Sequence, residues 1–371
     1  MKETLPWKWI LILLLFISCT QNPTSKETIK IGFIGPLTGD AADYGQVSRD
    51  SLQLAMDEIN AAGGINGRAI QMIWQDGKCN GKEANTAAQK LIFEDRVKII
   101  FFGGCSGEVL GAAPILEENK VIGFGPYTSS PDITKAGDYI FRNSYSDKDS
   151  GKTAANTIAK KYKTAVVIAE LTDFAQAYKK VFIEEFEKQG GKIVASEDYQ
   201  PENRDFRTSL LKIINAKPEA IFVDPQASAT GTAILQQLKE LGNTIPIYTN
   251  FFLSSEDAQK TVGNAAEGVV FIADPEPSGE RKDELIQKYK QRYGRPPAYE
   301  YPLPATYDAM HILTKAIGEV GYDATKIKEW LYKLPNYEGT LGTYRFDENG
   351  DVVGILPLVK VIKNGKAEKV E

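Results

Sequence analysis

Short apolar runs alternate along the chain with longer segments in which apolar residues recur at helical spacing. Residues 29–35 form an apolar run bounded by glycine, a pattern typical of a strand buried on both faces. Residues 44–62 carry apolar side chains on one helical face and are followed by Gly63 and Gly64, which predicts a helix that ends there. Further strands are expected at 70–74, 97–102, 121–124, 164–169, 193–196, 220–223 and 245–248. Helices are expected at 82–93, 108–118, 154–161, 178–188, 210–214 and 234–241. Strands that alternate with helices form parallel sheets covered on both faces, so the pattern predicts an α/β fold.

Three irregular stretches interrupt the alternation and indicate where the chain passes between two lobes. They lie at 143–147, 273–277 and 343–350. A chain of 371 residues is also too long for one ordinary core, which favours two lobes. Helices expected at 282–293 and 306–320 return to the first lobe, and a strand at 355–362 adds an edge to the second. The expected first lobe is therefore 29–144 plus 276–345, and the expected second lobe is 145–275 plus 346–371.

The N-terminus has the layout of a secretion signal. Lys2 and Lys8 precede an apolar stretch at 9–17, and polar residues follow Cys19. The apolar stretch is about half of the roughly 20 residues that span a bilayer, which argues against the alternative of a permanent transmembrane helix. We predict a signal peptide at 1–18 and a polar tether at 19–28.

The residues before Cys19 resemble a bacterial lipobox, although Phe16 stands where leucine is usual. The resemblance implies that Cys19 is lipidated and anchors the protein to the outside of a bacterial membrane, in the periplasm or at the cell surface. Ordinary signal cleavage is the alternative. An oxidising compartment would favour a disulfide between Cys79 and Cys105, with two free buried thiols as the alternative.

Composition excludes several classes of function. A formal net charge of −5 does not suit a nucleic-acid-binding protein, which normally needs a basic face. The single histidine, His311, cannot supply a histidine-based triad or a histidine-rich metal site. The chain carries no phosphate loop, and its Gly32 and Gly35 do not form a dinucleotide fingerprint. We therefore expect no enzyme activity, no cofactor and no metal, although an α/β fold alone does not exclude an enzyme.

The segment LAMDEINAAGGINGR at 54–68 resembles the signature of the leucine/isoleucine/valine-binding protein family of ABC-transporter receptors. Further matching segments, which extend the resemblance from residue 29 to about 362, are GPLTG at 35–39, DYG at 43–45, ATYDA at 305–309 and FDENGD at 346–351. The resemblance implies a type I periplasmic-binding-protein fold, with two Rossmann-like lobes joined by three hinge crossings. Some family members also carry a disulfide where Cys79 and Cys105 lie.

Parallel sheets bind ligands at the carboxyl ends of their strands, where helix N-termini receive negative charge. Ser106 lies at such a place, and the resemblance implies that it holds a ligand carboxylate; a helix cap is the alternative. In the loop 125–131, the resemblance implies a backbone contact from Tyr127 and a hydroxyl contact from Ser129. Tyr44 matches an aromatic residue that lines the ligand site, or it only begins its helix.

The second lobe departs from the family pattern. Amino-acid binders in the family place an acidic residue where this chain has Phe251, and Phe174 replaces a tyrosine. These two aromatic residues favour a hydrophobic or aromatic ligand, unless both pack in the core. A ligand ammonium would need another acid, because a buried unpaired charge is costly. Asp224, at the end of a strand, is the first candidate, and Glu170 and Asp173 are the others; each of them is alternatively a loop acid or a helix cap.

These observations predict a substrate-binding lipoprotein of an ABC importer. It would capture a small amino-acid-like or related carboxylate ligand by hinge closure and deliver it to permease subunits. A ligand-binding sensory receptor is the alternative from another class, and a Rossmann-type enzyme is the third.

Overall fold

The structure is a computed structural model that describes residues 27–276 and 280–370 of the 371-residue chain. The expected signal peptide, the predicted lipidation site Cys19 and residues 19–26 of the expected tether lie outside the described residues. Within the described ranges, no helix is both long enough and apolar enough to cross a membrane.

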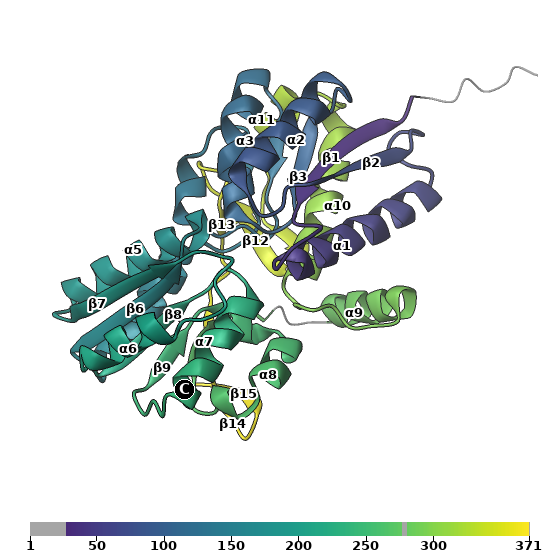
Figure 1. The fold of residues 1–371 in the computed structure, drawn as a ribbon. Helices are drawn as coiled ribbons and strands as arrows, with labels where there is room; N and C mark the ends of the chain where they lie inside the picture. Colours follow the sequence, from purple (N-terminus) through teal and green to yellow (C-terminus); the bar gives the residue numbers. More distant parts are fainter. Residues whose placement is uncertain (1–26, 277–279, 371) are drawn as a thin grey trace, which may run out of the picture.

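The first lobe is built on a parallel sheet with the strand order β2-β1-β3-β4-β5 (Figure 1). Its strands are β1 (Ile29–Gly35), β2 (Ile70–Asp76), β3 (Ile99–Phe102), β4 (Ile122–Phe124) and β5 (Ile140–Phe141). Its helices are α1 (Ala42–Ala61), α2 (Gly81–Phe93), α3 (Ser106–Asn119), η1 (Pro131–Lys135), α9 (Glu280–Tyr293), α10 (Pro302–Val320) and α11 (Ala324–Tyr332). Phe33 packs into the core on one face of the sheet and Ile34 into the core on the other, and both are fully buried. Strand β1 carries no polar side chain from residue 31 to residue 34, because helices cover both faces of the sheet.

The second lobe is built on a larger sheet with the order β15-β14-β10-β9-β8-β6-β7. Its strands are β6 (Thr164–Glu170), β7 (Lys192–Tyr199), β8 (Ala220–Asp224), β9 (Ile247–Thr249), β10 (Val270–Ala273), β14 (Leu358–Lys363) and β15 (Lys366–Lys369). Its helices are α4 (Asp147–Ala159), α5 (Asp173–Lys188), α6 (Arg207–Asn215), α7 (Ser228–Glu240), η2 (Phe251–Ser254), α8 (Glu256–Val262) and η3 (Gly263–Ala266). Strands β6 to β10 are parallel, whereas β14 and β15 run antiparallel to their neighbours.

The described chain passes between the lobes three times, as predicted: between β5 and α4, between β10 and α9, and between β13 and β14 (Figure 1). A small antiparallel sheet precedes the last crossing and contains β11 (Tyr337–Gly339), β12 (Gly342–Phe346) and β13 (Val352–Val353). The two Rossmann-like lobes of the predicted fold are therefore present. The residue boundaries given above for the lobes stay a prediction.

Two details of the predicted C-terminal region are wrong. The third crossing does not occupy 343–350, because Phe346 in β12 packs against Phe124 and Phe141 of the first lobe, with ring centroids 5.8 Å apart in both pairs. The strand expected at 355–362 is not an edge, because β15 pairs outside β14. Asn364 and Gly365, with φ of 51° and 72°, form the two-residue turn of that hairpin.

Candidate functional site

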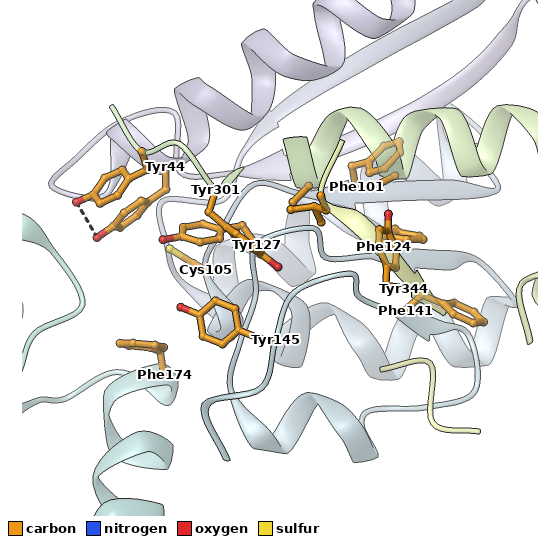
Figure 2. Close-up of a cluster of buried hydrophobic side chains, with 14 of the residues drawn as sticks. Tyr44, Phe101, Cys105, Phe124, Tyr127, Phe141, Tyr145, Phe174, Tyr301 and Tyr344 are labelled. Carbon is orange, nitrogen blue, oxygen red and sulfur yellow. Dashed lines mark hydrogen bonds between the residues drawn. The ribbon is translucent and has the colours of Figure 1, made fainter. Parts of the chain in front are cut away.

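Aromatic side chains from both lobes meet where the carboxyl ends of the two sheets face each other. Figure 2 shows Tyr44 and Tyr127 of the first lobe together, with Phe174 approaching from a helix of the second. The ring of Phe251 connects the groups, since its centroid lies 5.6 Å from those of Tyr127 and Phe174 and 6.2 Å from that of Tyr44. All four side chains are at most 5% exposed. The structure thus brings together four of the residues singled out from the sequence.

Hydroxyl groups add polar contacts to this aromatic cluster. Tyr44 donates to the backbone carbonyl of Gln226 in the second lobe at 3.1 Å. Tyr299, which precedes α10, donates to the Tyr44 hydroxyl at 3.3 Å and is also hydrogen-bonded to the Ser228 hydroxyl. Burial raises the pKa of Tyr44 and Tyr127 well above the ordinary value of 10.0, so both phenols stay protonated and can donate hydrogen bonds.

Ser106 is the first residue of α3 and is 1% exposed. Its hydroxyl accepts a hydrogen bond from the Ser130 backbone N–H at 3.1 Å, which joins the loop after β3 to the loop after β4. Cys105, not Ser106, occupies the N-cap position of α3, so the helix-cap alternative is wrong. Ser106 lies in the first turn of α3, and the backbone amides at a helix N-terminus suit an anionic group.

Ser129 joins the first lobe to the start of α4. Its backbone carbonyl accepts a hydrogen bond from the Asp147 N–H at 2.7 Å. Its hydroxyl lies near the Asp147 carboxylate and lowers the pKa of that group, against the larger effect of burial. Ser129 is 7% exposed, and the neighbouring Ser130 caps η1 by accepting from the Asp132 N–H at 3.4 Å.

The predicted disulfide between Cys79 and Cys105 is confirmed. It connects the loop before α2 to the residue that immediately precedes Ser106. The Cys79 N–H also donates to the Glu108 carboxylate at 3.0 Å, and burial raises the pKa of Glu108 to about 8. The start of α3 is therefore held to the neighbouring loop by a covalent bond and a hydrogen bond.

The three candidate acids of the second lobe have different surroundings. Glu170 is engaged within its own lobe, where one carboxylate oxygen accepts from Thr230 at 2.7 Å and from the Gln226 N–H at 2.9 Å. Asp173 is exposed and begins α5. Asp224 is fully buried; one oxygen accepts from the Asn250 amide at 2.8 Å, and the other has no hydrogen-bond partner. Of these three acids, only Asp224 is both fully buried and left with a carboxylate oxygen that has no hydrogen-bond partner.

Two further buried acids lie at the junction and were not singled out from the sequence. Asp147, the first residue of α4, is fully buried, and neither carboxylate oxygen has a hydrogen-bond partner. Asp274 follows β10 and accepts hydrogen bonds from Tyr145 at 2.7 Å and Tyr127 at 3.1 Å. Burial raises the pKa of each acid to about 7. Asp224 is the last residue of β8 and Asp274 directly follows β10. The search for polar residues at the carboxyl ends of strands could therefore have found Asp274 as well.

Among the residues that the structure describes, no group of three or more His, Cys, Asp or Glu side chains is arranged to hold a metal ion. His311 lies on α10 against the Tyr307 ring, at a centroid distance of 4.5 Å.

Comparison with known proteins extends over nearly the whole described chain. The sequence pattern of the family described as periplasmic binding protein matches residues 28–366. The chain is 28% identical over 336 residues to the leucine-, isoleucine-, valine-, threonine-, and alanine-binding protein of Pseudomonas aeruginosa, covering 88% of this chain and 87% of that protein.

Two solved structures share the fold. The leucine binding protein LivK of Thermotoga maritima has a TM-score of 0.83 at 27% identity, with 93% of this chain and 98% of that one covered. LivJ of Streptococcus pneumoniae, a branched-chain amino acid transporter substrate binding protein in complex with isoleucine, has a TM-score of 0.82 at 27% identity, with coverages of 92% and 98%. The chain therefore belongs to the periplasmic binding protein family, within the group of leucine/isoleucine/valine-binding proteins.

Proposed function

We propose that this protein is the extracytoplasmic substrate-binding component of an ABC importer, and that it captures a small amino-acid-like carboxylate between its lobes. The observation that carries the proposal is the position of Ser106. Its hydroxyl and the first-turn amides of α3 lie at the carboxyl edge of the first sheet, next to the loop of Ser129. A group of hydroxyl and N–H donors at a helix N-terminus suits a carboxylate. Relatives whose names include leucine and isoleucine binding support the same ligand class.

The apolar part of the ligand would lie against the aromatic cluster. Phe174 and Phe251 contribute rings from the second lobe, and Tyr44 and Tyr127 contribute rings from the first. Because contacts from both lobes form only when the lobes meet, a ligand that touches both favours the closed arrangement. In transport, the closed protein would then be recognised by permease subunits. In a sensory receptor, a signalling partner would recognise it instead. No chemical change of the ligand is part of this proposal.

Ser106→Ala tests the carboxylate site. We expect isothermal titration calorimetry to show at least a tenfold loss of affinity, since a hydrogen bond to a charged group contributes roughly 1.5–3 kcal/mol. The ligands to titrate are leucine, isoleucine, phenylalanine and benzoate, and mass spectrometry should recover them unchanged after release. Ser51→Ala is the matched control, because the Ser51 hydroxyl donates to the Leu303 carbonyl at 2.8 Å within the first lobe. An affinity that is equal in both variants would remove Ser106 from the site, and no binding of any panel member to the unaltered protein would overturn the proposal.

The lipid anchor is a separate part of the proposal and rests on the residues around Cys19. Replacing Cys19 with alanine should move the protein from the membrane fraction to the soluble extracytoplasmic fraction. Mass spectrometry of the unaltered mature N-terminus should show a diacylglycerol on the cysteine. An unmodified N-terminus that begins elsewhere would favour ordinary signal cleavage instead.

A further inference from the structure

The first turn of α3 contains a buried acid that has no role in the proposed ligand site. Glu108 is fully buried and occupies the third position of the helix, two residues after Ser106. One of its carboxylate oxygens accepts a hydrogen bond from the Cys79 N–H at 3.0 Å, and the other has no hydrogen-bond partner. Buried polar groups are nearly always paired in folded proteins, so a carboxylate oxygen left alone here indicates a specific state of the group.

The backbone holds this carboxyl beside the start of the helix. An acidic side chain at the third position of a helix can reach back to the N–H of the N-cap residue. Cys105 is the N-cap of α3, and its backbone acts on the pKa of Glu108. A Cβ atom on Gly77 would lie 2.3 Å from the bonded oxygen of Glu108, so the chain before Cys79 approaches the carboxyl as closely as only glycine allows. The carboxyl is therefore fixed between the loop after β2 and the N-terminus of α3.

The surroundings of Glu108 disfavour a negative charge. Burial has the largest effect on its pKa and raises it to about 8, and the nearby Asp76 carboxylate raises it further. Asp76 itself stays ionised. Burial opposes this ionisation, but hydrogen bonds from the Thr38 hydroxyl and the Leu37 N–H outweigh burial and lower the pKa of Asp76. Glu108 therefore faces a second acid and not a cation.

The elements packed against α3 supply no counter-charge to this carboxyl. These elements are α2, η1 and α5. The charged residues in the first turns of α2 and α5 and in η1 are exposed to solvent; they are Lys82, Glu83, Asp173, Asp132 and Lys135. Lys78, next to Cys79, is exposed as well and forms an ion pair with Glu83 at 3.8 Å. Among the described residues, no ion pair includes Glu108.

Glu108 shares its helix terminus with the proposed carboxylate site. Ser106 and Glu108 lie within one helical turn, which rises about 5.4 Å. The same terminus adjoins the aromatic cluster, because a Cβ atom on Gly104 would lie 3.6 Å from the Tyr127 ring; Figure 2 shows Cys105 together with that ring. A ligand carboxylate at Ser106 would bring a second negative charge to this terminus. Two carboxylates that share a buried site disfavour each other's ionisation, so one of them keeps a proton.

We propose that Glu108 couples ligand binding to the binding of one proton. A ligand carboxylate in the first turn of α3 would hold Glu108 in its neutral form, so that a ligand bound at alkaline pH is accompanied by a proton taken from solvent. The inference rests on the proposed function and assigns to Glu108 a control of affinity through the charge at the α3 N-terminus, without contact with the ligand.

The sign of the pH dependence follows from the raised pKa of Glu108. Well below pH 8 the acid is protonated in the free and the bound protein, so affinity should not change with pH through this group. As the pH rises through 8, the free protein loses this proton and must regain it to bind the ligand. Affinity should therefore fall on the alkaline side.

Calorimetric titrations of leucine, isoleucine, phenylalanine and benzoate between pH 6 and pH 9 test the coupling. For each panel member that binds, affinity should be constant up to pH 7 and fall roughly fivefold from pH 7 to pH 9, if the complex holds the proton about tenfold more tightly than the free protein. Glu108→Gln keeps an acceptor for the Cys79 N–H but cannot ionise. It should bind at pH 7 within about twofold of the unaltered protein and should lose the decrease at higher pH.

Proton uptake gives a second readout that a merely structural role would not change. At pH 8.5, titrations in Tris and in borate, whose ionisation enthalpies differ, should show that the unaltered protein takes up about half a proton more per ligand than Glu108→Gln. Asp147 and Asp274, whose pKa values are also raised, are present in both proteins, so the comparison removes their contribution.

Glu117→Gln is the matched control. Glu117 belongs to the same helix, and burial raises its pKa, but it lies near the C-terminus of α3 and accepts from the Tyr139 N–H at 2.6 Å. This variant should keep the pH profile and the proton uptake of the unaltered protein.

Equal pH profiles and equal proton uptake in the unaltered protein and Glu108→Gln would overturn the coupling and leave the proposed function standing. A loss of affinity in Glu108→Gln by the same factor at every pH would show a structural role only, and would overturn the coupling as well. The unaltered protein is also decisive by itself, since an affinity constant up to pH 9 without proton uptake would refute the coupling whether or not the variant folds. No binding of any panel member at any pH would overturn the proposed function and this inference with it.

Discussion

The Tyr44 hydroxyl donates a hydrogen bond to the Gln226 backbone carbonyl across the junction of the two lobes, with an oxygen–oxygen distance of 3.1 Å. Tyr44 lies in the first turn of α1, and Gln226 lies between β8 and α7, so the bond joins the strand-end loops of both sheets. Because the acceptor is a backbone atom, the contact depends on the relative position of the lobes and not on the identity of residue 226. The bond can therefore form only when the two lobes meet.

Tyr44→Phe should keep the ring packing and remove this inter-lobe bond, together with the acceptor of the hydrogen bond from the Tyr299 hydroxyl. We expect ligand affinity to fall about two- to tenfold, because an ordinary hydrogen bond contributes about 0.5–1.5 kcal/mol. Calorimetry measures the affinity, and small-angle scattering should show a larger open fraction without ligand. Tyr293→Phe is the control, since the Tyr293 hydroxyl donates to the Asp50 carbonyl at 2.9 Å within the first lobe. Equal losses in both variants would contradict a role specific to closure.

Asp274 should make the stability of the protein depend on pH. Burial raises its pKa from 3.8 to about 7, so between these values the folded state binds more protons at this site than the unfolded state. The contribution of Asp274 to the free energy of unfolding therefore decreases as the pH rises from about 4 to about 7. The charged and titratable groups that face it are Tyr44, Tyr127, Tyr145, Asp147, Tyr299, Tyr301 and Lys360.

The measurement is the difference in melting temperature between the unaltered protein and Asp274→Asn across that pH range. Subtraction removes the effect of acids whose pKa is lowered, such as Glu58 and Glu276, which act in the opposite direction. The unaltered protein should lose stability relative to the variant as the pH rises. A difference that is constant with pH would contradict the raised pKa.

The disulfide should contribute to both stability and binding. Replacing Cys79 and Cys105 together by alanine is expected to lower the free energy of unfolding by about 3 kcal/mol, for a sequence separation of 26 residues. Affinity should fall as well, because the bond holds the residue that precedes Ser106. Urea unfolding measures the first effect and calorimetry the second. A reductant should bring the unaltered protein to the level of the variant and should not affect the variant itself.

Substituting Arg142, at the first passage between the lobes, should lower the free energy of unfolding. Its fully buried guanidinium forms an ion pair with Asp351 at 2.6 Å and donates to the Ser130 carbonyl at 2.7 Å, so it joins the first crossing, η1 and the segment before the third crossing. Arg142→Met should lower the free energy of unfolding by about 3–5 kcal/mol, because it leaves Asp351 without its partner. The double variant Arg142→Met with Asp351→Asn should lose less than the sum of the single variants in chemical unfolding. Strict additivity would show that the pair is not coupled.

Much of the site could be predicted because its residues follow strands. Tyr127 lies in the loop after β4, and Asp224 is the last residue of β8. The carboxyl ends of parallel strands meet at one edge of a sheet. Asp147 could not be predicted in the same way. An acid in the first turn of a helix is expected on electrostatic grounds alone, so its place in the sequence did not indicate that the Asp147 carboxylate is fully buried. Tyr178 similarly fits the apolar stripe of α5, and only the packing of α4 against α5 brings it to Asp147.

The errors in the C-terminal region have local causes. Tyr344 and Phe346 alternate with exposed Thr343 and Arg345, which is the pattern of a half-buried strand, but the short length of β12 made it look irregular. The hairpin turn at Asn364 and Gly365 was present in the sequence. Strand β15 was overlooked because its residues, Lys366–Lys369, include three charged ones and no apolar run.

The order of the strands also restricts how this molecule can be divided. Strand β14 pairs with β10 in the second sheet, yet α9, α10 and α11 of the first lobe lie between them along the chain. No single cut releases one intact lobe, and a ribosome must synthesise nearly the whole polypeptide before the open edge of β10 is covered. Exchanging specificity with a homologue by recombination would therefore require three splice junctions, one at each passage, instead of one.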